Sequence, residues 1–250
     1  MDLATRWSNL FVGMSPASFF NFSFLPKYGV YFLQALGYTL LLAVISVLLA
    51  VIPALLLAFM RLSKNKFVRG ISGAYIAIFR STPLLVQLSI IYFGFFGAIS
   101  IPRLYIFGFI DISRFIPGVV ALALNSSAYV AEIFRAGILA VDALPQAVRN
   151  IMPSIGNEFV VNIKDSSVLN VISVNELFFM SKSAAGTYLR YFEVFFITAC
   201  IYLVLTFTVT RLLRLLERKM DGKTNYIIYG SQSDSKASIK IEKEEGVPRD

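Results

Sequence analysis

Amide and ionisable side chains lie inside the long apolar segments of this sequence, and they are the residues that could do chemistry. The densest group lies between residues 147 and 178 and comprises Asn157, Glu158, Asn162, Lys164 and Asp165. In lipid, each ionisable side chain costs about 2.5–3.5 kcal/mol on insertion scales, so it needs a polar partner or a water-lined cavity. We interpret this segment as a helix that faces a polar path, with a lone surface helix as the alternative.

Other kinds of chemistry are excluded by what the sequence lacks. Histidine is absent and Cys200 is the single cysteine, so His-ligated zinc, Ser-His-Asp triads and an internal disulfide are excluded. No acid pair or nucleophile–base arrangement is visible, so we expect no enzyme activity and no metal site. The letters GKT at 222–224 do not form a phosphate-binding loop, because Glu217 replaces its first glycine. We therefore expect this chain to bind no ATP or other cofactor.

Two smaller polar groups interrupt other apolar segments. Arg80 and Thr82 precede Pro83, and Gln87 follows about a turn later. Arg80 could reach a membrane surface, because a long cationic side chain can extend along apolar surface and keep its charge in water. Glu132 and Arg135 are spaced i, i+3, so on a helix they share one face and are expected to form a local ion pair.

The composition places these residues in a membrane protein. The chain has 250 residues, of which 57% are hydrophobic and 15% charged, and its mean hydropathy is +0.70. A soluble domain is nearer half apolar and one quarter charged. The net charge of +8 is better explained by basic cytoplasmic loops facing anionic lipid than by nucleic-acid binding.

Hydropathy predicts an all-α membrane protein with about five transmembrane helices, since a span needs about 20 apolar residues. The predicted spans are residues 28–60, 71–99, 115–140, 147–178 and 191–216, the fourth being the weakest by hydropathy. Pro53 is expected to kink the first span and Pro83 to break the second. We divide the chain into an N-terminal interfacial segment at 1–28, a transmembrane domain at 29–218 and a polar, disordered cytoplasmic tail at 219–250.

The distribution of basic residues predicts the orientation. Loops rich in Lys and Arg stay in the cytoplasm, and two basic groups lie at 61–69 and 211–219. The other connections carry fewer basic residues, which are mixed with acids. The N-terminus is therefore expected outside, and the C-terminus and the connection at 141–150 are expected in the cytoplasm.

Three stretches together resemble the permease subunits of bacterial, binding-protein-dependent ABC importers of polar amino acids. They are FRSTPLLVQL at 79–88, AYVAEIFRAGI at 128–138, and the segment 144–177 that begins LPQAVRNIMPS. The resemblance extends over about residues 29–218. It implies the type I importer fold in the cell membrane, a second permease subunit as homodimer or heterodimer, an extracytoplasmic amino-acid-binding protein, and a separate ABC ATPase subunit that binds the ATP. The resembled subunits carry the path and do no covalent chemistry.

The cytoplasmic coupling motif of these permeases is incomplete here. Their motif is E-A-A, three residues, Gly, nine residues, Ile, one residue and Leu-Pro, and this chain keeps the last two as Leu144 and Pro145. The Ile position holds Asp142, the Gly position Glu132, and E-A-A falls on residues 126–128. Compared with these permeases, about twenty residues are expected to be absent between 141 and 144. Three explanations fit: weak coupling, a longer natural gene product, or ATPase docking at another surface such as 61–69.

The resemblance and the polar residues together predict the functional positions. The substrate path is expected to include Thr82, Gln87, Asn157, Lys164, Asp165 and Ser166. They would bind the ammonium and carboxylate groups of the amino acid or make helix contacts that gate the path. The remaining ATPase-facing surface is expected at Leu144, Pro145 and Gln146. The alternative function is a transport-incompetent membrane scaffold or regulatory subunit of the same fold.

Overall fold

The computed structural model describes residues 22–99, 101–106, 108, 110–140 and 144–220. Its elements are α3 (Leu25–Leu62), α4 (Lys66–Ser81), α5 (Leu84–Ser89), the π-helix η1 (Ile90–Phe96), α6 (Gly97–Ile99), β1 (Tyr105–Ile106), β2 (Ile110–Asp111), α7 (Ile112–Leu139), α8 (Leu144–Asp165), the 3-10 helix η2 (Ser166–Ile172), α9 (Leu177–Tyr188) and α10 (Tyr191–Met220). The two short strands pair antiparallel. The helical class predicted from hydropathy is confirmed.

The long helices are apolar enough to cross a membrane. Among the described residues, α3, α7 and α10 meet the length and hydropathy needed for a span, and the bent pair 66–81 and 84–99 would make a fourth. These helices match four of the five predicted spans. The fifth predicted span corresponds to α8, which is too polar to qualify by hydropathy, so the count of five stays a prediction.

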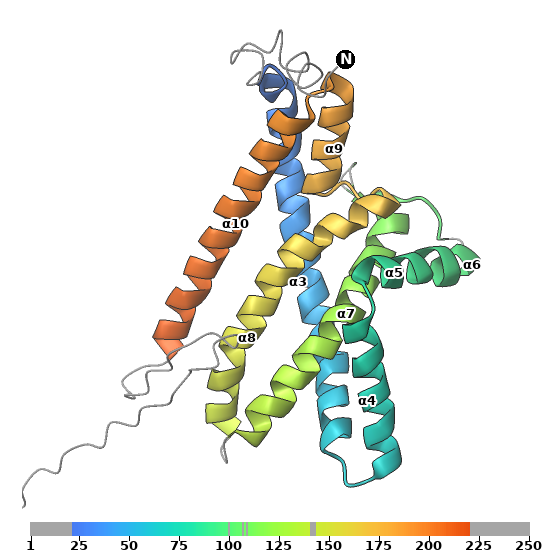
Figure 1. The fold of residues 1–250 in the computed structure, drawn as a ribbon, viewed down its shortest axis with the longest axis vertical. Helices are drawn as coiled ribbons and strands as arrows, with labels where there is room; N and C mark the ends of the chain where they lie inside the picture. The colour runs from blue at the N-terminus through green and yellow to red at the C-terminus, as the bar shows by residue number, and fades with distance from the viewer. Residues whose placement is uncertain (1–21, 100, 107, 109, 141–143, 221–250) are drawn as a thin grey trace, which may run out of the picture.

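The break in the predicted second span is sharp. The axes of residues 66–81 and 84–99 differ by 106°. Pro83 follows Thr82, whose backbone is extended at φ −107° and ψ 143°, because the proline ring disfavours helical geometry in the residue before it. In Figure 1, α5 and α6 consequently extend sideways from the top of α4. The expected break at Pro83 is confirmed.

Helix ends gather at two levels of the bundle. Figure 1 shows the end of α3, the start of α4, the end of α7 and the start of α8 in its lower part, where α10 also ends. The start of α3, the end of α9 and the start of α10 lie in its upper part. The end of α7 and the start of α8 therefore lie at the same end of the molecule as the connection at 63–65.

Small side chains let the central helices approach closely. Helix α3 packs along α7, and it buries Ala43, Ala50, Ala54 and Ala58 completely. Small residues are enriched where membrane helices contact one another, because lipid provides no hydrophobic drive to associate and close packing must replace it. By contrast, only 17% of the most apolar window of α10 is buried, so most of that helix faces outward.

The predicted fourth span is wrong in its upper bound. The α-helix ends at Asp165 and tightens into η2, and the chain turns at Ser173, whose φ of 58° is left-handed. Glu176 then caps the separate helix α9 by accepting hydrogen bonds from the backbone N–H groups of Phe178 and Phe179. Hydropathy alone could not locate this turn, because the residues around it are mostly apolar. The start of α9 is marked instead by the buried cap Glu176. The predicted tail and most of the N-terminal segment lie outside the described residues.

Candidate substrate path and its polar contacts

Gln87 joins the broken second span to α7. Its amide Nε2 donates to the carbonyl oxygen of Phe79 at 2.8 Å and to the carbonyl and hydroxyl oxygens of Thr82, both at 2.9 Å. Its Oε1 accepts a hydrogen bond of 2.9 Å from Asn125 Nδ2. The helical partner of the Phe79 carbonyl would be the N–H of Pro83, which proline lacks. Gln87 therefore supplies the donor that the break removes.

Ser126, which follows Asn125 on α7, contacts α8. Asn162 Nδ2 donates to Ser126 Oγ at 2.6 Å, and both side chains are buried. Glu158, one turn earlier on α8, is also buried, whereas the Oδ1 atom of Asn162 has no hydrogen-bond partner among the described residues. Consecutive residues of α7 thus bind different neighbours: Asn125 contacts the α5 side and Ser126 contacts α8.

A hollow of about 350 Å³ lies where α8, α9 and α10 meet. Its wall includes Lys164, Ser167, Thr198 and Tyr202, together with the rings of Phe178 and Phe195. The two rings stack with centroids 5.5 Å apart. A cation and hydroxyl groups on an otherwise apolar wall can bind the charged and polar groups of a small solute.

A buried carboxylate lies behind this hollow. Glu176 has no exposed surface, and its Oε2 accepts a hydrogen bond of 3.2 Å from the Tyr202 hydroxyl. Leu177 N–H, next to it, donates to Thr39 Oγ1 of α3 at 3.1 Å. These contacts fix the Tyr202 ring, and they hold the start of α9 against α3 and α10.

A second hollow of about 250 Å³ runs between α8 and α10. Lys164 lines it as well, so this side chain lies between the two hollows. The other basic residues on this wall are Arg211 and Arg214 of α10. Among the described residues, no group of three or more His, Cys, Asp or Glu side chains could hold a metal ion.

The lower end of the bundle carries a three-residue ion cluster. Glu132 of α7 lies 2.8 Å from Arg135 and 3.7 Å from Arg61 of α3, measured between oxygen and nitrogen atoms. The expected local pair is therefore confirmed, and it also reaches a second helix. Nearby, Gly137 of α7 lies so close to Ile151 of α8 that a Cβ atom added to the glycine would overlap this side chain.

The predicted path residues fall into separate groups. Thr82 and Gln87 are hydrogen-bonded to each other, whereas Lys164, Asp165 and Ser166 lie together at the end of α8. Lys164 lines both hollows, Ser166 donates to the Ile163 carbonyl, and Asn157 is exposed about two turns earlier on α8. Among the described residues, no hydrogen bond or ion pair joins the two groups. Whether these residues carry substrate stays a prediction.

The predicted ATPase-facing residues begin α8. Helix α7 ends at Leu139 and α8 starts at Leu144, with four residues between them, so the connection is as short as expected. Gln146 is exposed, and the side chains of Leu144 and Pro145 lie outside the described residues, as does Asp142. Whether this turn contacts an ATPase stays a prediction.

Sequence reasoning missed several polar residues that the structure brings into the site. They are Asn125, Ser126, Glu176, Thr198 and Tyr202. A signal existed for the first two, because Asn125 and Ser126 are adjacent polar residues within an apolar span. No comparable signal existed for Glu176 or Tyr202, since their significance depends on a turn and a contact between distant segments.

Comparison with known proteins gives consistent relatives. A Rickettsia felis protein named provisionally as a glutamine transport system permease, GlnP, is 34% identical over 79% of this chain and 95% of its own length. The arginine transport system permease ArtQ of Bacillus subtilis is 34% identical over 76% and 92%. A crystal structure of an amino acid ABC transporter with histidines is 38% identical, has a TM-score of 0.71, and matches over 80% of this chain and 98% of that one. No family model matches the chain.

The alignments also show that this chain is shorter inside the matched region. The match to GlnP extends over 218 residues but takes up 79% of the 250 residues here, which is about 198, so about 20 positions have no counterpart. This size agrees with the loss expected near residues 141–144, while its place in the chain stays a prediction. These relatives bear the names of transport permeases and give no support to the scaffold alternative. With such identity over most of its length, this integral membrane protein belongs to the permease subunits of amino acid ABC transporters.

Proposed function

We propose that this chain is the permease subunit of an importer of polar or charged amino acids in the cytoplasmic membrane. The observation that carries the proposal is the hollow beside Lys164, where a cation and hydroxyl groups lie on an otherwise apolar wall. The relatives named for glutamine and arginine transport support a polar solute. A zwitterionic amino acid matches this wall, because its carboxylate can bind the Lys164 ammonium group.

The proposed topology has five spans, with the N-terminus outside and the C-terminus in the cytoplasm. In this arrangement α8 is the fourth span, and its polar face is turned away from lipid. The distribution of basic residues supports the orientation, since the lower end of the bundle carries Arg61, Lys64, Lys66, Arg69, Arg135, Arg149, Arg211, Arg214 and Arg218. Positive residues of short loops and helix ends remain on the cytoplasmic side.

Within the path, the end of α8 is proposed to bind the solute directly. Lys164 would hold the carboxylate, and Asp165 would attract the ammonium group. Ser166 donates its proton to a backbone carbonyl, so it would position this turn, and Asn157 would line the path nearer the cytoplasm. Gln87 and Thr82 are proposed to gate the path through helix contacts, because the hydrogens of the Gln87 amide are already taken by Phe79 and Thr82.

The proposed partners are an ABC ATPase, an extracytoplasmic amino-acid-binding protein and a second permease subunit. Closure of the ATPase on ATP would switch the permease between two packings that open to opposite sides. The connection of four residues between α7 and α8 leaves little chain to project from the bundle. We therefore propose weak coupling through the first turn of α8, at Leu144 to Gln146, and through the basic surface at 61–69.

Uptake by reconstituted liposomes tests the path. The chain would be assembled with its ATPase and binding protein, and labelled amino acid uptake measured for Lys164→Gln and for the control Lys182→Gln, an exposed lysine on α9. We expect loss of most uptake for the first variant and little change for the second. Equal uptake by both variants would overturn the role of Lys164.

Co-purification tests the coupling. An affinity tag on the permease should recover little ATPase from detergent extracts, and a relative with the longer connection serves as the positive control. A stable complex of one permease to one ATPase chain, with ATP hydrolysis stimulated by substrate, would contradict weak coupling. Weak coupling lowers the uptake of the wild-type chain and both variants alike, so the role of Lys164 is measured as uptake relative to the wild-type chain.

A further inference from the structure

A basic groove lies on the outer side of the bundle, between α8 and α10. It has a volume of about 250 Å³, and it is lined by Val160 and Lys164 of α8 and by Leu203, Thr206, Phe207, Thr210, Arg211 and Arg214 of α10. The two arginines are three residues apart, so they lie on the same face of α10. Along α10 the wall therefore changes from Leu203 and Phe207 toward the middle of the helix to Arg211 and Arg214 toward its end, and Lys164 lines it from α8.

The arginines are held at the groove without an acidic partner. Arg211 Cζ lies 4.9 Å from the centre of the Phe207 ring, which places the guanidinium group over the wall. Within the described part of the chain, Arg211 and Arg214 form no ion pair, whereas Arg61, Arg114, Arg135 and Arg190 each do. Two guanidinium groups on one face therefore repel each other and attract an anion.

The apolar part of the groove opens outward. Leu203 is 68% exposed and Phe207 58%. Cys200, Leu203, Phe207 and Arg214 are spaced three, four and seven residues apart, so they form one stripe along α10. A bound molecule could therefore contact cations at one end of this stripe and hydrocarbon along the rest.

We propose that this groove is a binding site for one anionic phospholipid. The phosphate lies between Arg211 and Arg214, and one acyl chain follows Phe207 and Leu203 toward Cys200. Arginine binds phosphate oxygens by pairs of hydrogen bonds. Basic pockets between membrane helices are suited to anionic headgroups. The inference goes beyond transport, and it requires only that α10 crosses the membrane.

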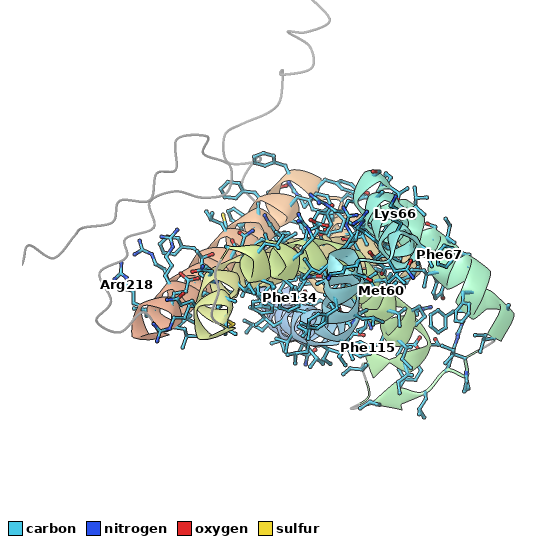
Figure 2. The ribbon with its side chains drawn as sticks, turned by 90° about the horizontal axis from the view of Figure 1, so that it is seen from below. Met60, Lys66, Phe67, Phe115, Phe134 and Arg218 are labelled. Atoms are coloured by element: carbon cyan, nitrogen blue, oxygen red, sulfur yellow. The ribbon has the colours of Figure 1, made fainter. Side chains whose placement is uncertain are left out.

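A bulk attraction between basic residues and anionic lipid is the competing explanation. The basic residues of α4 make a matched control, because Lys66 and Arg69 are exposed near the same end of the bundle and neither lines the groove. Figure 2 views the molecule from below and shows Lys66 on the opposite side from Arg218 of α10. Bulk attraction would respond equally to charge removal on either helix.

The native cysteine provides the reporter. Cys200 is the single cysteine and is exposed, so a fluorophore can be attached to the unmodified chain. The labelled protein in detergent would be titrated with brominated phosphatidylglycerol and with brominated phosphatidylcholine. Quenching at lower concentrations of phosphatidylglycerol is expected. The double variant Arg211→Gln/Arg214→Gln should lose this preference, by about fivefold for each basic charge removed, and Lys66→Gln/Arg69→Gln should keep it.

Several outcomes would overturn the proposal. Equal quenching by the two lipids, or equal loss in both double variants, would leave only bulk attraction. Displacement of the lipid by millimolar inorganic phosphate at constant ionic strength would identify a free-phosphate site. A disulfide between the Cys200 residues of two chains in membranes would show a second copy on this face. If the double variant fails to fold, the single variants Arg211→Gln and Arg214→Gln replace it, and each should lose preference while Lys66→Gln keeps it.

Discussion

Replacing Gln87 with methionine should separate the broken second span from α7. Methionine keeps the length of the side chain and removes its amide group. The carbonyl of Phe79 then loses its donor, the carbonyl of Thr82 loses another, and Asn125 loses its acceptor. The Phe79 carbonyl has no helical substitute, because Pro83 has no N–H.

The magnitude follows from these three losses. Hydrogen bonds inside membrane proteins contribute about 0.6 kcal/mol on average and at most about 1.7 kcal/mol. A buried polar group left without a partner costs about 1–3 kcal/mol. We therefore expect Gln87→Met to lower the free energy of unfolding by about 2–4 kcal/mol, from the sum of three such losses.

Unfolding by sodium dodecyl sulfate in mixed micelles measures this change. The matched control is Gln34→Met, because Gln34 is exposed on α3. A double-mutant cycle with Asn125→Leu isolates the contact between Gln87 and Asn125, with an expected coupling of about 0.6–1.7 kcal/mol. The reasoning is refuted if Gln87→Met and Gln34→Met have equal effects, or if the cycle gives no coupling.

Three further changes test other contacts. Gly137→Ala should lower stability by about 1–3 kcal/mol through overlap with Ile151, and Ile151→Ala in the same chain should restore part of it in thermal unfolding. Glu132→Gln should cost at most about 1 kcal/mol, because its ion pairs are partly exposed, and denaturation in high salt should reduce the difference. Glu176→Ala removes the acceptor for two N–H groups at the start of α9 and should cost about 0.5–2 kcal/mol, whereas hydrogen exchange at those amides should stay slow if the capping argument is wrong.

The fold was predictable where long apolar runs dominate. Helices α3, α7 and α10 follow directly from hydropathy, since lipid requires every backbone hydrogen bond to be made within a span. Pro83 also gave the position of a break, because the restriction it imposes is local. The 106° direction of that break was not predictable, since it depends on the Gln87 amide and on the position of α7.

The site was predictable in part. Lys164 stood out because a cation in a span needs a polar surrounding, and it does line both hollows. Tyr202 looked like one aromatic residue among many in an apolar run. Its place in the hollow depends on Glu176, which lies 26 residues away in sequence. Long-range contacts of this kind leave no periodic trace in the sequence.

The helix contacts differ in how much of the chain must be synthesised before they can form. Helices α7 and α8 are joined by four residues, so the loop-closure entropy of their pairing is small and they can pair early. The first half of α3 is different: Thr39 binds Leu177, 138 residues later, and Tyr28 hydrogen-bonds Thr187, 159 residues later. Tyr38, in the same half, can already pack against Phe115 of α7, but Tyr28 and Thr39 lack these hydrogen-bond partners until α9 has been made. The beginning of α3 is therefore among the last parts of the bundle to be packed, because its neighbours there belong to α9 and α10.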